Sequence, residues 1–378
     1  MRTLNAKLLK ETLDARVSGD VQRGTVGCAA LLVQQNGETV YENFFGEQSP
    51  GVPVNRKSMF RMASMTKPIT GAAISILLER GLLNLDDPVE KFLPEFANRK
   101  IGKLNADGEI EIVADAQKPI TILHLLTHSS GLGVGEMDVC QRGKMMPEEK
   151  RSLSTVVKSY AKNVLSFEPF SKSEYSPFQA FETLGRIAEL LSGMEYDAFL
   201  QKELFDPLEM VDTTFAPNAE QWARMIPMHN YVDGKACVAE TTPGCVFEDF
   251  SVNWHCGAAG LASTMDDYRK FAEMLQNGGI WNGRRVLKEE TVRKMATPYI
   301  HWDNGKESWG LSVRVIRDAS YEVLPVGTFG WSGAYGTHFW VDPENRVTAV
   351  YLKNSRYDGG SGAKTSYQFE KDVHHSFE

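Results

Sequence analysis

Residues 28–46, CAALLVQQNGETVYENFFG, carry the clearest structural pattern in the chain. Two runs with strand composition flank Asn36-Gly37, a pair that suits the type I′ turn of a β-hairpin. A two-stranded hairpin is not stable alone in water, so both strands need further partners. The stretch therefore predicts one part of a larger antiparallel sheet.

The partners of this hairpin are predicted near the other end of the chain. Three runs there have strand composition: WGLSVRVI (309–316), FGWSGAYGTHFW (329–340) and VTAVYLKN (347–354). Asp342-Pro343-Glu344-Asn345 forms a turn between the last two. We therefore expect an α/β protein of the α+β type, whose central antiparallel sheet of about five or more strands is built from both chain ends.

Helices are predicted at both termini and through the middle of the chain. The N-terminal segment has apolar residues with helical spacing at Leu4, Leu8, Leu9, Leu13 and Val17. A closing helix over about 364–376 carries Tyr367, Phe369 and Val373. Further helices are expected at 69–80, 121–128, 152–165 and 177–192.

This distribution predicts two domains. Residues 1–67 and 226–378 would form the α/β sheet domain, with the terminal helices flanking the sheet. Residues 68–225 would form a large, mainly helical insertion. The active site is expected in the cleft between the two domains.

Composition and charge limit the possible functions. Of the 378 residues, 42% are hydrophobic and 24% are charged, as in ordinary globular proteins. The net charge of −8 disfavours a nucleic-acid or anionic-membrane partner, since both require a basic surface. The N-terminal segment is amphipathic and interrupted by charges, unlike a secretory signal, so we expect a cytoplasmic protein.

The cysteines and histidines do not predict a metal site. The five cysteines form no disulfide framework, and Cys237, Cys245 and Cys256 lack a C-x-x-C pair, so buried thiols are expected rather than a zinc site. His124 and His128 have the spacing of two ligands on one helix, but no Glu follows His124 as in His-Glu-x-x-His. The sequence predicts neither a metal nor another cofactor.

Ser332 lies between glycines and raises the question of a nucleophile elbow. In G-x-S-x-G the second glycine follows the serine by two places, whereas Gly333 follows Ser332 directly. The elbow also needs a helix immediately after the serine, and here the pattern continues as strand, turn and strand. Ser332 is therefore not predicted to be the nucleophile.

Ser-x-x-Lys occurs three times, and its context separates the three copies. The copy at 159–162 lies in an exposed-looking helix, and the copy at 361–364 in a glycine-rich loop. Ser64 and Lys67 precede an apolar helix, where i, i+3 spacing places both on one face. Pro68 is acceptable in the first turn of that helix. A serine here is often only an N-cap, but this copy best fits a nucleophile.

A nucleophilic serine also needs a proton acceptor, which an ammonium group cannot be. Before the helix that follows, Ser176, Pro177 and Gln179 have the pattern of a capping box, and we assign them to capping. This leaves Tyr175 unexplained. The positive end of a helix dipole would stabilise its phenolate, more so if Lys67 lies near, which makes Tyr175 the candidate base.

Five stretches, in family order over residues 60–345, then carry a resemblance to a known family. They are FRMASMTKPITGAAISILLERGLLNLDDPV, ITILHLLTHSSGL, YSPF, CGAAGLASTMDDYRKF and GWSGAYGTHFWVDPE. The chain resembles the serine β-lactamase/penicillin-binding-protein superfamily in its class C-like branch. That branch also contains family VIII carboxylesterases, D-stereospecific aminopeptidases and acyltransferases.

The resemblance implies a β-lactamase/transpeptidase-like fold and a role for each matching residue. Ser64 would be the acylated nucleophile, Lys67 its hydrogen-bonded proton partner, and Tyr175 the general base for both half-reactions. The third motif, Lys/His-Thr/Ser-Gly, corresponds to Trp331-Ser332-Gly333 and would line the site. The oxyanion hole would consist of the backbone N–H groups of Ser64 and of Ala334, on an edge strand.

Two departures from the family pattern bear on the substrate. The Tyr-x-Asn motif ends in Pro177, so the amide that would contact Lys67 and a substrate amide is absent. Trp331 replaces the cation that would hold a substrate carboxylate. The loss of such a charge-assisted bond costs about 1.5–3 kcal/mol, and an indole offers an apolar wall instead. Trp-x-Gly resembles the esterase branch.

We therefore expect a metal-independent serine ester hydrolase, closest to family VIII carboxylesterases, that acts on small apolar esters through an acyl-Ser64 intermediate. Three alternatives stay open. The enzyme would be a β-lactamase or D-amino-acid peptidase of the same fold, or an acyltransferase if the acceptor is not water. A non-enzymatic, penicillin-binding-like scaffold is the third, against which the intact Ser64, Lys67 and Tyr175 argue.

Overall fold

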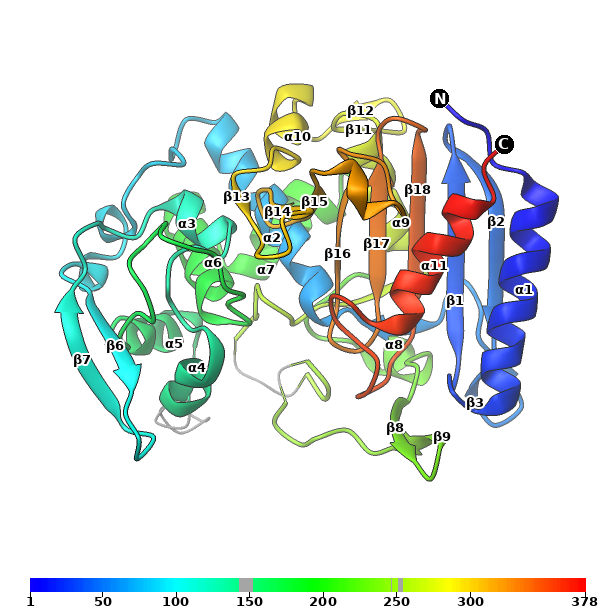
Figure 1. Cartoon of the computed structure of the whole chain (residues 1–378), viewed down its shortest axis with the longest axis horizontal. Coiled ribbons are helices and arrows are strands. Elements are labelled where there is room, and N and C mark those ends of the chain that lie inside the picture. Colours follow the sequence, from blue (N-terminus) through cyan, green and yellow to red (C-terminus); the bar gives the residue numbers. More distant parts are fainter. Residues whose placement is uncertain (143–151, 246, 251–253) are drawn as a thin grey trace.

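A computed structural model describes residues 1–142, 152–245, 247–250 and 254–378. Its centre is an eight-stranded antiparallel sheet with the order β13-β14-β15-β16-β17-β18-β1-β2 (Figure 1). Strands from the two chain ends meet where β1 pairs with β18. The predicted sheet is confirmed, with more strands than the sequence indicated. In chain order its strands are β1 (Ala29–Gln35), β2 (Glu38–Phe45), β13 (Ile300–His301), β14 (Glu307–Trp309), β15 (Arg314–Ile316), β16 (Phe329–Ser332), β17 (His338–Asp342) and β18 (Val347–Leu352).

Helices lie against both faces of this sheet and beside it (Figure 1). The two terminal helices and α9 are closest to the strands. The α-helices are α1 (Ala6–Arg23), α2 (Thr66–Glu79), α3 (Ile122–Leu126), α4 (Gly135–Arg142), α5 (Leu153–Tyr160), α6 (Gln179–Ser192), α7 (Tyr196–Leu200), α8 (Ala219–Ala223), α9 (Met265–Gln276), α10 (Glu289–Met295) and α11 (Lys364–His375). None of the helices in the described ranges is long and apolar enough to cross a membrane.

The hairpin of β1 and β2 has the predicted turn. Asn36 and Gly37 have φ values of 55° and 81°, the left-handed conformations that a type I′ turn requires. β1 is buried along its whole length because both faces of the sheet are covered. Alternate residues face opposite cores: Leu31 belongs to the core under α1 and α11, and Leu32 to the core that contains α2 and α9.

The terminal helices cover one face of the sheet, as predicted. Leu9 and Leu13 of α1 and Phe369 of α11 are buried in the core beneath them. Two residues expected on the same apolar faces are exposed instead, Leu8 at 44% and Tyr367 at 45%. Helical spacing places a residue near a face, but the width of the covered stripe depends on how closely the helix lies on the sheet.

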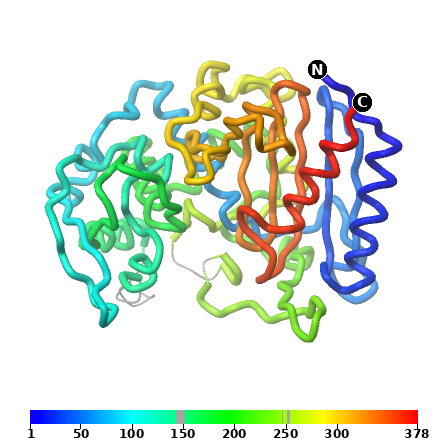
Figure 2. Tube along the Cα trace, viewed as in Figure 1, coloured from blue at the N-terminus to red at the C-terminus, as the bar shows by residue number. Residues whose placement is uncertain are grey.

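The middle of the chain lies on the side of the sheet away from α1 (Figures 1 and 2). Most of its regular structure is helical, although a hairpin that the sequence did not predict, β6 (Lys100–Leu104) and β7 (Ile110–Asp115), projects from it (Figure 1). The helix predicted at 152–165 ends at Tyr160. α2 is buried over most of its length and connects the two parts of the molecule.

The predicted capping box before α6 is wrong. The helix begins at Gln179 and its N-cap is Phe178, whose side chain makes no capping hydrogen bond. Ser176 instead accepts a hydrogen bond from the Ala180 N–H at 3.2 Å, while its own N–H donates to a histidine of the preceding loop. The chain before α6 is thus held by tertiary contacts that the local pattern does not contain.

Two of the predicted C-terminal strands are each interrupted by a turn. Residues 309–316 form the end of β14 and all of β15, joined by a turn in which Ser312 has a φ of 68°. Residues 329–340 form β16 and part of β17, joined by a tight turn that contains Ala334. β16 is an interior strand of the sheet, so the expectation that Ala334 lies on an edge strand is wrong.

Candidate active site

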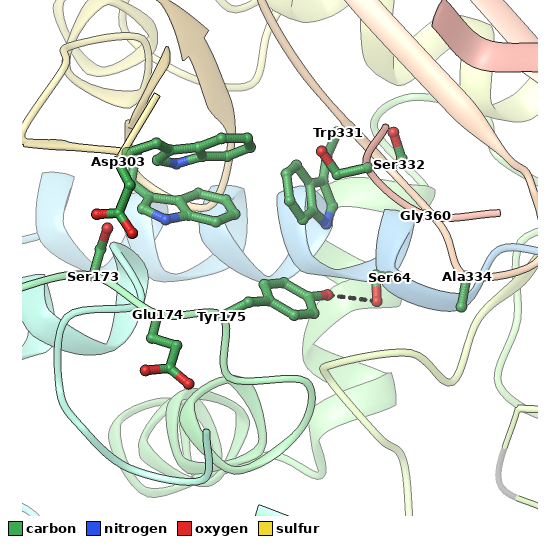
Figure 3. Close-up of a pocket in the computed structure, with 12 residues that line it drawn as sticks. Ser64, Ser173, Glu174, Tyr175, Asp303, Trp331, Ser332, Ala334 and Gly360 are labelled. Atoms are coloured by element: carbon green, nitrogen blue, oxygen red, sulfur yellow. Dashed lines mark hydrogen bonds between the residues drawn. The ribbon is translucent and has the colours of Figure 1, made fainter. Parts of the chain in front are cut away.

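A cavity of about 410 Å³ opens between the β16–β17 turn, the start of α2 and the loop before α6 (Figure 3). Its lining combines hydroxyl groups, aromatic rings and two carboxylates. The lining residues are Ser64, Ser173, Glu174, Tyr175, Trp302, Asp303, Trp309, Trp331, Ser332, Ala334, Gly360 and Ser361. The cavity therefore brings together Ser64, Tyr175, Trp331 and Ala334, which the sequence analysis singled out from distant segments.

Ser64 lies in a single 3-10 turn, η1 (Ala63–Met65), directly before α2. The first bond of this turn runs from the Met65 N–H to the Met62 carbonyl, so the Ser64 N–H is among the leading amides that have no partner within a helix. Ala63 has a φ of 46°, a conformation that is strained for a residue with a Cβ. The local backbone thus presents the Ser64 hydroxyl and amide at the cavity.

Lys67 lies one turn after Ser64 and is fully buried. Its Nζ donates to Ser64 Oγ at 3.2 Å and to the carbonyls of Pro177 and Ala258 at 2.8 and 2.9 Å. An ammonium has three donors, and these acceptors engage all of them. Lys67 therefore acts on Ser64 as a hydrogen-bond donor. Pro177, which was expected to bind substrate, is not among the described residues that line the cavity, and it contributes its carbonyl to Lys67 instead.

Tyr175 approaches Ser64 from the loop before α6. Its hydroxyl donates to Ser64 Oγ at 2.7 Å, the contact marked in Figure 3. The Lys67 Nζ lies 4.9 Å from the centre of the Tyr175 ring. This arrangement places the Lys67 ammonium beside Ser64 Oγ and the Tyr175 ring.

His128 holds Tyr175 in place, a role that the sequence did not reveal. Its ring lies 4.6 Å from the Tyr175 ring and 4.3 Å from Trp309. Complete burial holds the pKa of His128 well below its usual range, with the Lys67 charge adding to the effect, so the imidazole is neutral. Its Nδ1 accepts from the Ser176 N–H at 3.0 Å and fixes the residue after Tyr175.

Trp331 forms the wall that faces Tyr175. The side chain is only 4% exposed, and its ring lies 5.5 Å from Tyr175 and 4.6 Å from Trp309. Figure 3 shows the indole nitrogen directed toward the Tyr175–Ser64 pair. Within the described residues this buried Nε1 has no hydrogen-bond partner. The wall is therefore apolar, with one donor directed at the place where a substrate would lie.

Gly333 allows the β16–β17 turn to pack against Ser64. A Cβ on Gly333 would lie 2.3 Å from the Met62 carbonyl oxygen and 2.2 Å from Thr337 Oγ1, so only glycine fits. Thr337 Oγ1 also donates to the Met62 carbonyl at 2.9 Å. These contacts hold Ala334 and Ser64 at the same cavity, as the predicted oxyanion hole requires.

Ser332 belongs to a second polar array, behind the cavity. Its Oγ lies 2.8 Å from His338 Nδ1, and His338 Nε2 lies 3.0 Å from the Glu370 carboxylate. Arg314 and Tyr321 also donate to Glu370. Glu370 accepts only, so His338 Nε2 carries the proton, and its Nδ1 accepts from the Ser332 hydroxyl. No local sequence pattern connects these residues, because they come from β15, η6 (Ala319–Tyr321), β16, β17 and α11.

Two ionisable groups of this array have shifted pKa values. Burial alone would raise the pKa of Glu370, but the Arg314 charge and the hydrogen bond from His338 bring it down to about 2. Burial lowers the pKa of His338, against the opposing effect of Glu370, so its imidazole is neutral at pH 7. The array therefore contains an ion pair between Glu370 and Arg314, with the neutral His338 beside it.

The thiols and the other histidines form no comparable centre. Among the three cysteines once considered together, Cys256 is buried, Cys245 is half-buried and Cys237 is exposed, so the expectation of buried thiols is wrong for Cys237. Within the described ranges, no group of three or more His, Cys, Asp or Glu side chains could hold a metal ion.

The sheet flanked by helices, with Ser64, Lys67 and Tyr175 meeting at one cavity, defines a serine hydrolase of the β-lactamase/transpeptidase fold. The family model "Beta-lactamase" matches residues 13–370, and the chain belongs to this family. Esterase EstB of Burkholderia gladioli is 29% identical, over 96% of this chain and 95% of that protein.

Solved structures agree with this fold. EstCE1, a hydrolase with promiscuous acyltransferase activity, superposes with a TM-score of 0.78 at 22% identity, over 98% of both chains. A variant of simvastatin synthase (LovD) from Aspergillus terreus has a TM-score of 0.79 at 19% identity, over 97% of this chain and 98% of that one.

Proposed function

We propose that this protein is a carboxylesterase that hydrolyses small apolar esters through an acyl-Ser64 intermediate. The contact between Tyr175 and Ser64 Oγ, 2.7 Å long and located in an aromatic cavity, is the observation that carries the proposal. The similarity to Esterase EstB supports an ester substrate. The substrate is a small molecule, and no nucleic-acid or membrane partner is proposed.

In the acylation step, Tyr175 in its phenolate form takes the Ser64 proton while Oγ forms a bond to the ester carbonyl carbon. The carbonyl π electrons move to oxygen, and the N–H groups of Ser64 and Ala334 stabilise the resulting oxyanion. When the tetrahedral intermediate collapses, the C–O bond to the alcohol breaks. The leaving alkoxide then takes the proton from Tyr175, which yields the free alcohol and the acyl-Ser64 ester.

Deacylation repeats these steps with water in place of Ser64. Tyr175 takes a proton from the water while its oxygen bonds to the acyl carbon, and the collapse of the second intermediate releases Ser64 Oγ, which regains the proton. Lys67 donates to Ser64 Oγ throughout and stays close to the Tyr175 ring. Its charge therefore stabilises both the phenolate and the serine oxygen when each is anionic.

The aromatic wall favours esters over carboxylate-bearing substrates such as β-lactams. Trp331 stands where the family's third motif has a cation, and none of the described residues that line the cavity is Lys, Arg or His. Glu174 and Asp303 add negative charge to the same lining. A substrate carboxylate would thus gain no ion pair and would meet like charges.

One paired assay tests the proposal. Hydrolysis of p-nitrophenyl butyrate and of a chromogenic cephalosporin is measured with wild type and with Ser64→Ala. We expect the ester to be hydrolysed with the higher kcat/KM and its turnover to disappear in Ser64→Ala. An ester activity that survives Ser64→Ala would contradict the mechanism.

The remaining outcomes distinguish the alternatives. A cephalosporin turnover above that of the ester would indicate a β-lactamase. An added alcohol that diverts the butyryl group into a new ester faster than water hydrolyses it would indicate an acyltransferase. No turnover of either substrate, together with no fluorophosphonate labelling of Ser64, would favour a binding protein.

A further inference from the structure

The end of the cavity beyond Tyr175 has a composition that an uncharged ester does not require. Trp302 and Trp309 lie there, with ring centroids 5.0 Å apart, and Trp309 stacks on the Tyr175 ring at 6.1 Å. Trp331 meets Trp302 edge-on at 6.1 Å. Three indoles and one phenol thus surround one end of a cavity of about 410 Å³.

Asp303 adds an anionic group to this aromatic end. It is exposed, lines the cavity, and lies beyond Tyr175 on the side away from Ser64 and Ala334 (Figure 3). Among the described residues it forms no ion pair, whereas Glu174 nearby is paired with Lys172 at 2.9 Å. Asp303 is therefore the carboxylate in the lining whose charge is not neutralised by a neighbour.

Aromatic faces combined with a carboxylate are a chemistry for binding cations. Ring quadrupoles attract an ammonium group within about 6 Å of a ring centroid, most strongly for Trp. Among the described residues, no positively charged side chain that could compete lines the cavity. The three donors of Lys67 are directed to Ser64 and two carbonyls. The aromatic end of the cavity beyond Tyr175 therefore combines a negative charge with apolar walls.

The proposed mechanism indicates which part of an ester would lie there. Tyr175 returns its proton to the departing alcohol, so the alcohol portion must lie on the Tyr175 side of Ser64. The aromatic end with Asp303 is on that side (Figure 3). The partnerless Trp331 Nε1, buried between the two ends, is available to donate to an oxygen of the ester.

We infer that the site takes esters whose alcohol portion carries a cationic group, such as a quaternary ammonium, bound by Trp302, Trp309 and Asp303. The inference rests on the proposed esterase function and names a substrate class for it. The acyl portion stays small and uncharged. The cation lies against the cavity-facing side of the indole cluster, and its charge is balanced by Asp303 at the rim.

The test compares two esters of the same shape. Butyrylcholine and 3,3-dimethylbutyl butyrate differ only in the replacement of the quaternary nitrogen by carbon. We expect wild type to prefer the choline ester by about three- to thirtyfold in kcat/KM, mainly through KM. Because exposed charges are screened by salt, the ratio should fall as ionic strength rises from about 0.01 to 0.5 M.

Three variants assign the effect to its source. Asp303→Asn should lower the preference ratio about two- to fivefold and remove much of its salt dependence. Trp302→Leu, which keeps an apolar wall without a π face, should also lower it. Glu174→Gln should change it less, because that carboxylate is already paired. Asp107→Asn, an exposed acidic residue of the β6–β7 hairpin, is the control and should leave the ratio unchanged.

A binding measurement separates this inference from the esterase proposal. Choline should quench tryptophan fluorescence at lower concentration than 3,3-dimethylbutanol, and Asp303→Asn should reduce the difference. Hydrolysis of p-nitrophenyl butyrate with an equal or reversed preference between the matched esters would overturn the cationic-substrate inference alone. A protein that hydrolyses none of the three esters would overturn the esterase proposal, and equal quenching by both alcohols would then overturn the cation site as well.

Discussion

Two of the serines that line the cavity, Ser64 and Ser332, each contact a group that takes part in proton transfer in other enzymes. Ser64 meets Tyr175 and Lys67, whereas Ser332 meets His338, which in turn meets Glu370. By residue type the second array has the Ser-His-Glu composition of a hydrolase triad. In the proposed function, nevertheless, the first array carries out the nucleophilic attack.

The difference lies in what surrounds each serine. Ser64 is at the start of a helix, next to leading amides that can stabilise an oxyanion, and close to the Lys67 charge. Ser332 is in an interior strand, and Glu370 beyond its histidine is neutralised by Arg314. We therefore assign the Ser332 array a structural role. The comparison shows that a nucleophilic serine is identified by the backbone amides and charges around it, and not by the residue types of its partners alone.

The largest expected effect is that of Ser64→Ala on ester hydrolysis. Loss of the nucleophile should lower kcat by roughly 10³–10⁶-fold, as in other serine hydrolases. The measurement is turnover of p-nitrophenyl butyrate, with fluorophosphonate labelling mapped by mass spectrometry. Fluorophosphonate label on Ser332 in the wild-type protein would contradict the assignment of Ser64 as the nucleophile.

Tyr175→Phe should have the next largest effect, because it removes only the proton acceptor. A general base contributes about 10²–10⁴-fold, so kcat should fall by that amount while the variant remains folded. Tyr41→Phe, which removes a phenol on β2 that contacts Asp14, is the matched control and should retain activity. Near-wild-type kcat in Tyr175→Phe would assign the base to another group.

Glu370→Gln should affect stability, since it leaves Arg314 buried with a single carboxylate partner, Glu307. Breaking a buried pair costs about 3–5 kcal/mol, measurable as a lower midpoint in urea. Glu290→Gln, at an exposed ion pair with Lys294, is the control and should change the midpoint little. Equal midpoints for both variants would show that the array does not stabilise the fold.

The same array predicts a pH dependence of stability. The pKa of Glu370 is about 2, against an ordinary value of 4.5, so its contribution is present above about pH 4.5 and is lost as the pH falls toward 2. Wild type should therefore lose more stability than Glu370→Gln over that interval. Parallel pH profiles for the two proteins would contradict the depressed pKa.

Ser332→Ala should have the smallest effect on ester hydrolysis. It therefore tests directly whether Ser64, and not Ser332, is the nucleophile. It removes a hydroxyl from the lining and leaves His338 Nδ1 without its donor, so we expect less than about a tenfold change in kcat/KM. Its kcat is measured beside that of Ser64→Ala with the same ester. A loss as large as that of Ser64→Ala would reverse the assignment of the two serines.

Much of the fold could be predicted because its signals are local. The Asn36-Gly37 turn and the apolar spacing of both terminal helices are short-range patterns, and the structure confirms them. The failures have tertiary causes. In the predicted capping box the Ser176 N–H would donate to the Gln179 side chain, but it donates to His128 instead. Residues 309–316 bend at Ser312, where the turn packs against α2.

The sequence was sufficient to propose Ser64, Lys67 and Tyr175, because the motif spacing and the order of the family stretches are properties of the chain itself. The structure brings the three residues into contact. It could not reveal that Pro177 serves Lys67 through a carbonyl, that His128 supports Tyr175, or that Ser332 and Glu370 belong to one array. Those relations join residues far apart in the chain, by 110 positions for Lys67 and Pro177, and the path of the chain between them sets the distances. The aromatic cavity with Asp303 exists for the same reason, since packing alone places three indoles and a carboxylate around one space.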